Sequence, residues 1–388
     1  MAEALRVIGT SATLTGALRR QAHADLDFPI EFEVLDGLAC QSRGMLSPES
    51  YDVYDQWFHS LDLLWTAGSI QAIDTGRIGR WPQVRSSGVF GGAGQGFGTR
   101  PGDVLFVQPD RTLSAVPASA VPPISMLPTS YNVDSFAYMP ELAARRRPDE
   151  PESWAWLLDE RWHGRCALSL DPAASAVELA MAVEAAGLMR VGDPGDLTVE
   201  EIDEMFGHLM ARKRSGHFSR FWTSAEDSIR LLSTSGCVVS SLWSPAYYGM
   251  RKLGFDLTYA APAEGYRGWH SGMCLSAAAQ GARLEMAYRY LNWWLDGVPG
   301  AIMARQGYYM SVPEPLRDTL SGEEWDYWYG GLPAAADLPD MEGRVVVRKG
   351  ECREGGGYHQ RLAKVRVWST IMPEHNYLVR RWHEFQKA

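Results

Sequence analysis

Short apolar runs alternate with amphipathic segments along this chain, and the two patterns predict strands and helices in turn. Residues 5–10 (LRVIGT) and 30–37 (IEFEVLDG) have the pattern of strands, and residues 11–26 between them form a loop that opens into a helix. Further on, the pattern passes from strand to helix near Trp57, and this helix ends at Gly68, a residue type common at helix ends. Strands that alternate with helices indicate an α/β fold built on a parallel sheet.

The middle of the chain repeats this order of strand, turn and helix. Residues 165–171 (RCALSLD) predict a buried strand, and residues 173–188 predict a helix directly after it. Residues 197–216 predict a second helix, because Thr198 and Glu201 have the spacing of a capping box and basic residues stand at the other end.

The last third continues in the same way. Residues 236–243 predict a strand that leads into a helix at 244–254, and residues 272–280 predict another strand. An apolar stripe along residues 282–297 predicts a long helix, and a final helix is expected at 377–388.

The size and charge of the chain narrow the possible functions. A chain of 388 residues that is 46% apolar can bury a large core, and we expect two domains. The net charge of -10 argues against a nucleic-acid partner, because phosphate binding requires clustered Lys and Arg. No segment approaches the roughly 18 apolar residues of a membrane span, so we expect no direct membrane insertion. The opening MAEALRVIG also lacks the pattern of a secretory signal.

The cysteines and aromatic residues add two further indications. The five cysteines are widely separated and form no C-x-x-C motif, which argues against a zinc ribbon or a dense disulfide scaffold. One pair can still form a bridge, and our expectation is Cys237 with Cys274. The 15 Trp and 16 Tyr residues supply core volume and also faces on which a ligand can stack.

The glycine-rich stretch at 89–99 would hold a phosphate only between a strand and a helix. Pro101 and Gly102 follow it instead, so we interpret it as a flexible loop. The nucleophile elbow, zincin, P-loop and EF-hand patterns are absent from the sequence, so we expect neither catalysis nor a cofactor.

Three residues raise the question of a metal ion. Tyr247 and Tyr248 are potential ferric-ion ligands, but adjacent residues in a helix point about 100° apart, which favours packing. His270 on its own would be a weak metal site, because zinc requires three or four converging donors. We therefore expect His270 to be packed or hydrogen-bonded, and we expect no metal site.

Several motifs resemble those of one known family when they are taken in chain order. They are YDVYDQWFHSLDLLWTAGSIQAID at 51–74, SWAWLLDERWHGRCALSLDP at 153–172, GYRGWHSGMCLSAAAQGARLEMAYRYLNWWL at 265–295 and GYYMSVPE at 307–314. Together they resemble the solute-binding proteins of ABC importers, in particular the family that includes spermidine- and putrescine-binding proteins. The resemblance covers more than 300 residues.

This resemblance implies a type II periplasmic binding protein: two α/β lobes joined by crossover strands, with a ligand cleft at the carboxyl ends of the strands. Residues 1–135 and 270–310 would form lobe 1, and residues 136–269 and 311–388 would form lobe 2. Closure of the lobes would signal to the permease subunits of an ABC transporter. The implied protein is a periplasmic monomer whose signal peptide has been removed.

The resemblance also implies a set of ligand-binding residues, carried over segment by segment. They are Thr10, Ser11, Trp57, Phe58, His59, Tyr131, Asp171, Trp243, Arg267, Trp269, Ser271 and Tyr308.

The sequence departs from the polyamine-binding pattern at two positions. Ser271 stands where those proteins hold an ammonium group with an Asp, and Ala176 or a neighbour stands where they have an acidic residue early in a helix. A desolvated ammonium group needs nearby carboxylates, because an unpaired buried charge is costly. We therefore expect a zwitterionic, quaternary-amine or aromatic solute, recognised by Trp57, Trp243 and Trp269 through stacking or cation–π attraction.

Three alternatives remain open. They are a polyamine-binding protein with an altered pocket, a ferric-ion-binding protein of the same fold, and an enzyme on the same scaffold. The last is the least favoured, because no nucleophile and base pair is visible in the sequence.

Overall fold

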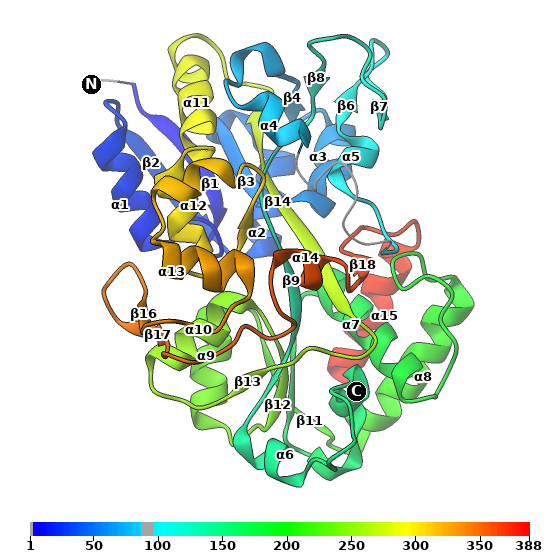
Figure 1. Ribbon diagram of the computed structural model, residues 1–388. Coiled ribbons are helices and arrows are strands. Elements are labelled where there is room, and N and C mark those ends of the chain that lie inside the picture. Colours follow the sequence, from blue (N-terminus) through cyan, green and yellow to red (C-terminus); the bar gives the residue numbers. More distant parts are fainter. Residues whose placement is uncertain (1–2, 87–95) are drawn as a thin grey trace. The chain divides into compact units, whose positions relative to one another are not determined.

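The computed structural model describes residues 3–86 and 96–388, which divide into two compact units (Figure 1). Unit 1 gathers the described residues of Met1–Ala93, Thr99–Asn132 and Trp269–Tyr329. Unit 2 gathers those of Gly94–Gly98, Val133–Gly268 and Gly330–Ala388. The long strands β9 (Leu127–Tyr138) and β14 (Tyr266–Ser276) each contribute residues to both units.

The sheet of unit 1 is parallel at its centre. Strand β1 (Leu5–Thr10) pairs in parallel with β2 (Ile30–Leu35) on one side and with β3 (Val53–Trp57) on the other. The unit 1 part of β14 runs antiparallel to β3, with Ser271 opposite Trp57. The carboxyl ends of β1 and β3 therefore meet at one edge of this sheet.

Helices follow the parallel strands of unit 1. Helix α1 (Gly16–Asp25) begins after β1, where the Thr15 hydroxyl caps it by accepting from the Leu18 amide. Helix α3 (Leu61–Ala67) follows β3 and ends at Gly68, whose φ of 68° is the left-handed conformation that glycine adopts without strain.

The remaining elements of unit 1 are short except for α11. They are α2 (Gly37–Leu46), η1 (Pro48–Ser50), η2 (Phe58–Ser60), β4 (Ile70–Gln71), β5 (Ile73–Asp74), η3 (Thr75–Arg77), α4 (Trp81–Ser86), α5 (Pro101–Val104), β6 (Phe106–Val107), β7 (Leu113–Ser114), β8 (Pro123–Ile124), α11 (Gly281–Trp294), α12 (Gly297–Ala304), β15 (Tyr309–Met310), η6 (Glu314–Asp318), α13 (Gly322–Trp325) and η7 (Asp326–Gly330).

Unit 2 has the same arrangement of strands. Strand β10 (Cys166–Ser169) pairs in parallel with β11 (Phe218–Trp222) and with β12 (Val239–Leu242), and the unit 2 part of β9 runs antiparallel to β12. Helix α7 (Pro172–Ala185) follows β10, and helix α10 (Ser244–Lys252) follows β12. The amino ends of both helices thus lie at the edge where the parallel strands end.

The core of unit 2 lies against α7, which is apolar on nearly every face and almost entirely buried. Helices α8 (Val199–Arg214) and α15 (His375–Lys387) pack together beside it, as Figure 1 shows. The other elements of this unit are α6 (Pro140–Arg145), η4 (Trp154–Leu158), η5 (Glu160–Trp162), α9 (Ala225–Thr234), β13 (Thr258–Tyr259), β16 (Leu338–Pro339), β17 (Val345–Val347), α14 (Tyr358–Leu362) and β18 (Val365–Trp368).

Residues 311–329 group differently from the assignment made in the sequence analysis, which placed them in lobe 2. In the structure they belong to unit 1. The physical reason is local: β15, directly before them, pairs with Tyr131 and Ser130 of β9, and η6 packs against α12.

The cysteine expectation was wrong, because all five thiols are free. Cys237 belongs to unit 2, where its sulfur lies 3.3 Å from the Ser219 hydroxyl. Cys274 belongs to unit 1, where it lies on β14 and is fully buried.

The glycine-rich stretch is only partly covered by the structure. Gly91, Gly92 and Gly94 lie outside the described residues. Gly98 has a φ of 81°, and a Cβ there would lie 2.2 Å from the Trp368 carbonyl oxygen. Gly98 is therefore required by close packing against β18.

Candidate functional site

The carboxyl ends of β1 and β3 bring five of the sequence-predicted residues to one edge of the unit 1 sheet. Gly9 pairs with Asp55, so in the same register Thr10 comes level with Gln56 and Ser11 with Trp57, where the two strands end. Thr10 is buried, and Trp57 is half-buried. Beyond them lie Ser11, Phe58 and His59, and the His59 ring stacks on Trp57 with centroids 5.6 Å apart and planes 15° apart. The edge thus presents a partly exposed aromatic pair beside hydroxyl groups.

Strand β14 adds Trp269 and Ser271 to the same edge. The buried Ser271 hydroxyl donates to the Gln56 carbonyl oxygen at 3.1 Å. Trp269 meets the Tyr308 ring edge to face at 5.1 Å. Its indole N–H is buried and has no hydrogen-bond partner among the described residues. Trp269 therefore keeps an unused donor.

Strand β9 supplies Tyr131, whose ring lies 5.4 Å from that of His270 and 6.1 Å from that of Tyr309. Burial, and secondarily the charge of Arg100, lowers the pKa of His270 to about 3. His270 is thus a neutral, packed imidazole. We call the set Thr10, Ser11, Trp57, Phe58, His59, Tyr131, Trp269, Ser271 and Tyr308 the unit 1 edge.

Two buried polar residues that the sequence analysis missed flank Tyr131 in β9. The Ser130 hydroxyl and both polar atoms of the Asn132 amide have no hydrogen-bond partner among the described residues. Leaving such a group unsatisfied costs about 1–3 kcal/mol, so these atoms are suited to bind water or a polar ligand. The signal in the sequence was the spacing of Ser130 and Asn132 by two residues, which places both side chains on one face of a buried strand.

The sequence analysis also missed Asp55, which lies two residues before Trp57 in β3. Its side chain is fully buried, and neither carboxylate oxygen has a hydrogen-bond partner within 3.5 Å among the described residues. Burial raises the pKa of Asp55 to about 7, and the neighbouring Thr13 hydroxyl opposes this shift. Asp55 is therefore a poor source of fixed negative charge near neutral pH.

The edge of unit 2 carries Asp171 and Trp243. Asp171 Oδ1 caps α7 by accepting from the amides of Ala173 at 2.9 Å and Ala174 at 3.3 Å. Trp243 directly precedes α10, is half-buried, and meets the ring of Trp222 edge to face at 4.9 Å. We call Asp171, Trp222 and Trp243 the unit 2 edge; Trp222 was not singled out from the sequence.

Arg267 is committed to internal partners within unit 2. Its guanidinium donates to Glu178 at 2.8 Å, to Asp134 at 2.7 Å and to the Ser369 hydroxyl at 2.9 Å, and the whole group is buried. Burial raises the pKa of Glu178 to about 7, while Arg267 opposes the shift. A ligand would have to displace one of these partners to reach Arg267. We therefore do not assign Arg267 to the unit 2 edge, and its contact with a ligand stays a prediction.

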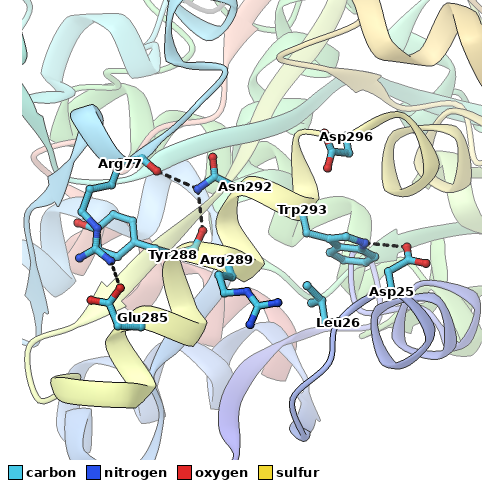
Figure 2. Close-up of a pocket in the computed structure, with 9 residues that line it drawn as sticks. All are labelled: Asp25, Leu26, Arg77, Glu285, Tyr288, Arg289, Asn292, Trp293 and Asp296. Carbon is cyan, nitrogen blue, oxygen red and sulfur yellow. Dashed lines mark hydrogen bonds and ion pairs between the residues drawn. The ribbon is translucent and has the colours of Figure 1, made fainter.

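A separate cavity of about 600 Å³ lies in unit 1 (Figure 2). None of the sequence-predicted residues lines it. Its walls come from the end of α1, from η3 and from one side of α11. Four of its lining residues pair with one another: Arg77 with Glu285 at 2.7 Å, and the Trp293 indole with Asp25 at 2.8 Å. This cavity is thus distinct from the unit 1 edge.

The structural comparisons give the fold. No protein-family model and no curated protein sequence matches the chain. Solved structures of ABC-transporter substrate-binding proteins match it over nearly its whole length. The chain has the α/β fold of type II periplasmic binding proteins. This confirms the fold class that the resemblance implied.

Three similar structures illustrate this likeness. A putative spermidine/putrescine ABC transporter from Listeria monocytogenes has a TM-score of 0.66 at 14% identity, over 99% of this chain and 98% of that chain. An ABC transporter substrate-binding protein from Bradyrhizobium japonicum has a TM-score of 0.62 at 16% identity, over 98% of this chain and 99% of that chain. The third is the spermidine/putrescine substrate-binding protein PotD from Streptococcus pneumoniae, in complex with calcium and HEPES. It has a TM-score of 0.62 at 12% identity, over 100% of this chain and 99% of that chain.

Proposed function

We propose that this chain is the substrate-binding component of an ABC importer and captures a small zwitterionic, quaternary-amine or aromatic solute. The observation that carries the proposal is the unit 1 edge, where aromatic rings and hydroxyl groups gather at the carboxyl ends of parallel strands. In open α/β sheets this is the edge at which ligands bind. The fold shared with ABC-transporter substrate-binding proteins supports the same class of function.

The chemistry of the unit 1 edge supports the choice of solute. Trp57 and Trp269 offer aromatic faces, which attract a cationic or π-bonded group. The unpartnered N–H of Trp269 and the Asn132 amide offer hydrogen bonds to a carboxylate or another polar group. A solute with both an apolar or cationic part and an anionic part would satisfy both.

A free polyamine is a less suitable ligand, because one of the carboxylates it needs is replaced by a serine and the other is paired with an arginine. Ser271 provides a hydroxyl group at the position where the polyamine-binding pattern has an Asp. Glu178, the acidic residue of α7 nearest to the second position, is paired with Arg267. Two protonated amines would then lose their hydration without gaining an opposite charge.

The ferric-ion alternative is disfavoured by the state of its two tyrosines. Tyr247 and Tyr248 are both buried and pack edge to face at 4.9 Å. The Tyr247 hydroxyl donates to Glu354 at 3.1 Å, and burial is the largest cause that raises the pKa of Tyr247. A ferric-ion ligand needs a tyrosine that loses its proton easily.

The partner and the location of the protein follow from the proposal. We expect a monomer that works outside the cytoplasmic membrane and delivers its solute to permease subunits. Among the described residues, no helix is long and apolar enough to cross a membrane.

A thermal-shift screen tests the proposal. The purified chain would be heated with polyamines, betaines, amino acids, sulfonates, phosphonates and aromatic acids, because a bound ligand raises the unfolding temperature by mass action. We expect a member of the zwitterionic, betaine or aromatic groups to stabilise the chain most, with one-to-one binding in a calorimetric titration. Strongest stabilisation by putrescine or spermidine would contradict the choice of solute, and no stabilisation by any compound would contradict the proposed function.

A further inference from the structure

Three metal-ligating side chains that are not part of the unit 2 edge converge in unit 2. Glu160 lies in η5, His163 directly follows that turn, and His217 directly precedes β11. One donor atom from each lies within 4.8 Å of the other two. The sequence signal was the Glu-x-x-His spacing of Glu160 and His163, but nothing local to them pointed to His217.

His217 has the environment of a metal-binding histidine. Its side chain is fully buried, and its Nε2 lies 2.9 Å from the Leu157 carbonyl oxygen. Since a carbonyl only accepts, Nε2 carries the proton and Nδ1 presents a lone pair. Nδ1 has no hydrogen-bond partner among the described residues. Ligating histidines commonly donate their other N–H to a backbone carbonyl in this way, which fixes the ring orientation.

Backbone hydrogen bonds hold the two segments together without help from a metal. The Gly164 amide donates to the His217 carbonyl oxygen at 3.0 Å, and the His217 amide donates to the Arg212 carbonyl oxygen at 3.0 Å. The single turn of η5 places His163 Nδ1 3.4 Å from Glu160 Oε2. The three donors are thus positioned before any ion binds.

We propose that Glu160, His163 and His217 bind a divalent transition-metal ion of the zinc class. Two imidazoles and one carboxylate suit Zn²⁺, Co²⁺ or Ni²⁺, whereas Ca²⁺ and Mg²⁺ prefer oxygen ligands alone. Three protein ligands leave a fourth tetrahedral position for water. The Glu160 and His163 side chains are 67% and 42% exposed, so an ion has access from solvent.

The charges around the cluster are compatible with this ion. Arg212 pairs with Glu160 through Oε1, whereas His163 faces Oε2, so the ion can take Oε2 while Arg212 keeps Oε1.

The cluster stands apart from the solute-binding surface of the proposed function. Its residues come just before β10 and β11, at the amino ends of these parallel strands, whereas Asp171 and Trp243 follow the carboxyl ends of β10 and β12. A bound ion would therefore tie the η5 turn to the start of β11 without occupying the unit 2 edge. The two proposals are therefore independent: a failure of metal binding would not contradict solute binding, and a failure of solute binding would not contradict metal binding.

The test is a calorimetric titration of the full, tag-free chain with Zn²⁺ after chelator treatment, together with the visible spectrum of the Co²⁺ form. We expect one ion per chain and the intense visible absorption of tetrahedral Co²⁺. His163→Gln changes an exposed side chain, so the variant should fold normally and lose at least about tenfold in Zn²⁺ affinity. Glu160→Gln should also weaken binding.

Two control variants separate this site from incidental binding. His383→Gln removes an exposed histidine on α15 and should bind Zn²⁺ as the unchanged chain does. Cys352→Ser removes the exposed thiol and should also leave binding unchanged. Failure of the unchanged chain to bind Zn²⁺, unaltered affinity in His163→Gln, or loss of binding only in Cys352→Ser would each overturn the proposal.

Discussion

The unit 1 edge and the unit 2 edge occupy equivalent places in their sheets. They differ in how many of their polar groups already have hydrogen-bond or ion-pair partners within the protein. Both follow parallel strands, and both carry tryptophan. In unit 2, Asp171 accepts two amides of α7, and the nearby Arg267 is neutralised by Asp134 and Glu178. In unit 1, the Trp269 indole N–H and the Asn132 amide are buried and have no partner among the described residues.

This difference indicates which unit determines the identity of the solute. A polar group that already has an internal partner contributes to folding, and using it for a ligand would cost that partner. A buried polar group without a partner gains its first hydrogen bond when a ligand arrives. We therefore infer that unit 1 recognises the solute's polar groups, and that the charged residues of unit 2 mainly hold that unit together.

The largest effect is expected from Arg267→Ala. The change leaves Asp134 and Glu178 buried without an opposite charge, so the free energy of unfolding should fall by about 3–5 kcal/mol. Denaturant unfolding measures this loss. Arg366→Ala removes a half-exposed ion pair with Glu184 and should cost less than about 1 kcal/mol. Equal losses in the two variants would show that the buried ion pair is not the stabilising feature of unit 2.

A pH-dependent effect is expected from Asp55→Asn. Burial raises the folded-state pKa of Asp55 to about 7, above its unfolded value, so the folded state binds this proton more tightly. The stability of the unchanged chain should therefore fall as pH rises from about 4 to about 7 and stay reduced above that.

The Asp55→Asn variant, which has no proton to lose, should lack this part of the pH dependence. Because one pKa unit corresponds to about 1.4 kcal/mol, it should exceed the unchanged chain in stability near pH 8 by about 3–4 kcal/mol. Unfolding near pH 5 and near pH 8 measures the difference. A variant less stable than the unchanged chain at both values would mean that Asp55 is charged and paired in the folded state.

A smaller effect, on affinity, is expected from Trp57→Ala. If Trp57 stacks on the solute, binding should weaken by about 1–3 kcal/mol, measured by calorimetry with the strongest stabiliser from the screen. Trp65→Ala is the matched control, because Trp65 is also half-buried in unit 1 but lies on α3 against Arg111. Equal affinities in the two variants would remove Trp57 from the solute-binding surface.

The smallest effect is expected from Asp171→Ala. The loss of this helix cap should reduce stability by about 0.5–2 kcal/mol. Asp36→Ala removes the cap of α2, which accepts from the Ala39 amide at 2.9 Å, and should cost a similar amount. Only Asp171→Ala should also change solute affinity if the ligand-binding prediction for Asp171 holds. Unchanged affinity would leave Asp171 as a cap alone.

Local signals in the sequence predicted much of the fold. The capping box of Thr198 and Glu201 is present as predicted and begins α8, and Gly68 ends α3 as expected. The strand at 5–10 coincides with β1. These features depend on residues a few positions apart, so their physical cause is visible in a short stretch of sequence.

The features that escaped prediction depend on residues far apart in the chain. Arg267 meets Asp134 across 133 positions and Glu178 across 89, and no local pattern indicates that its charge is neutralised. His217 likewise joins Glu160 and His163 only through the pairing of distant segments. The residues of the unit 1 edge were carried over from the resemblance, and their contact with a solute remains a prediction.

The central claim, that the unit 1 edge holds the solute, is tested most directly by a crystal structure of the chain with the strongest stabiliser from the screen. The account predicts that the solute lies against Trp57, Trp269 and Tyr308, with a polar group bonded to the Trp269 indole or the Asn132 amide. Solute bound instead in the cavity of Figure 2, beside Arg77 and Arg289, would contradict it.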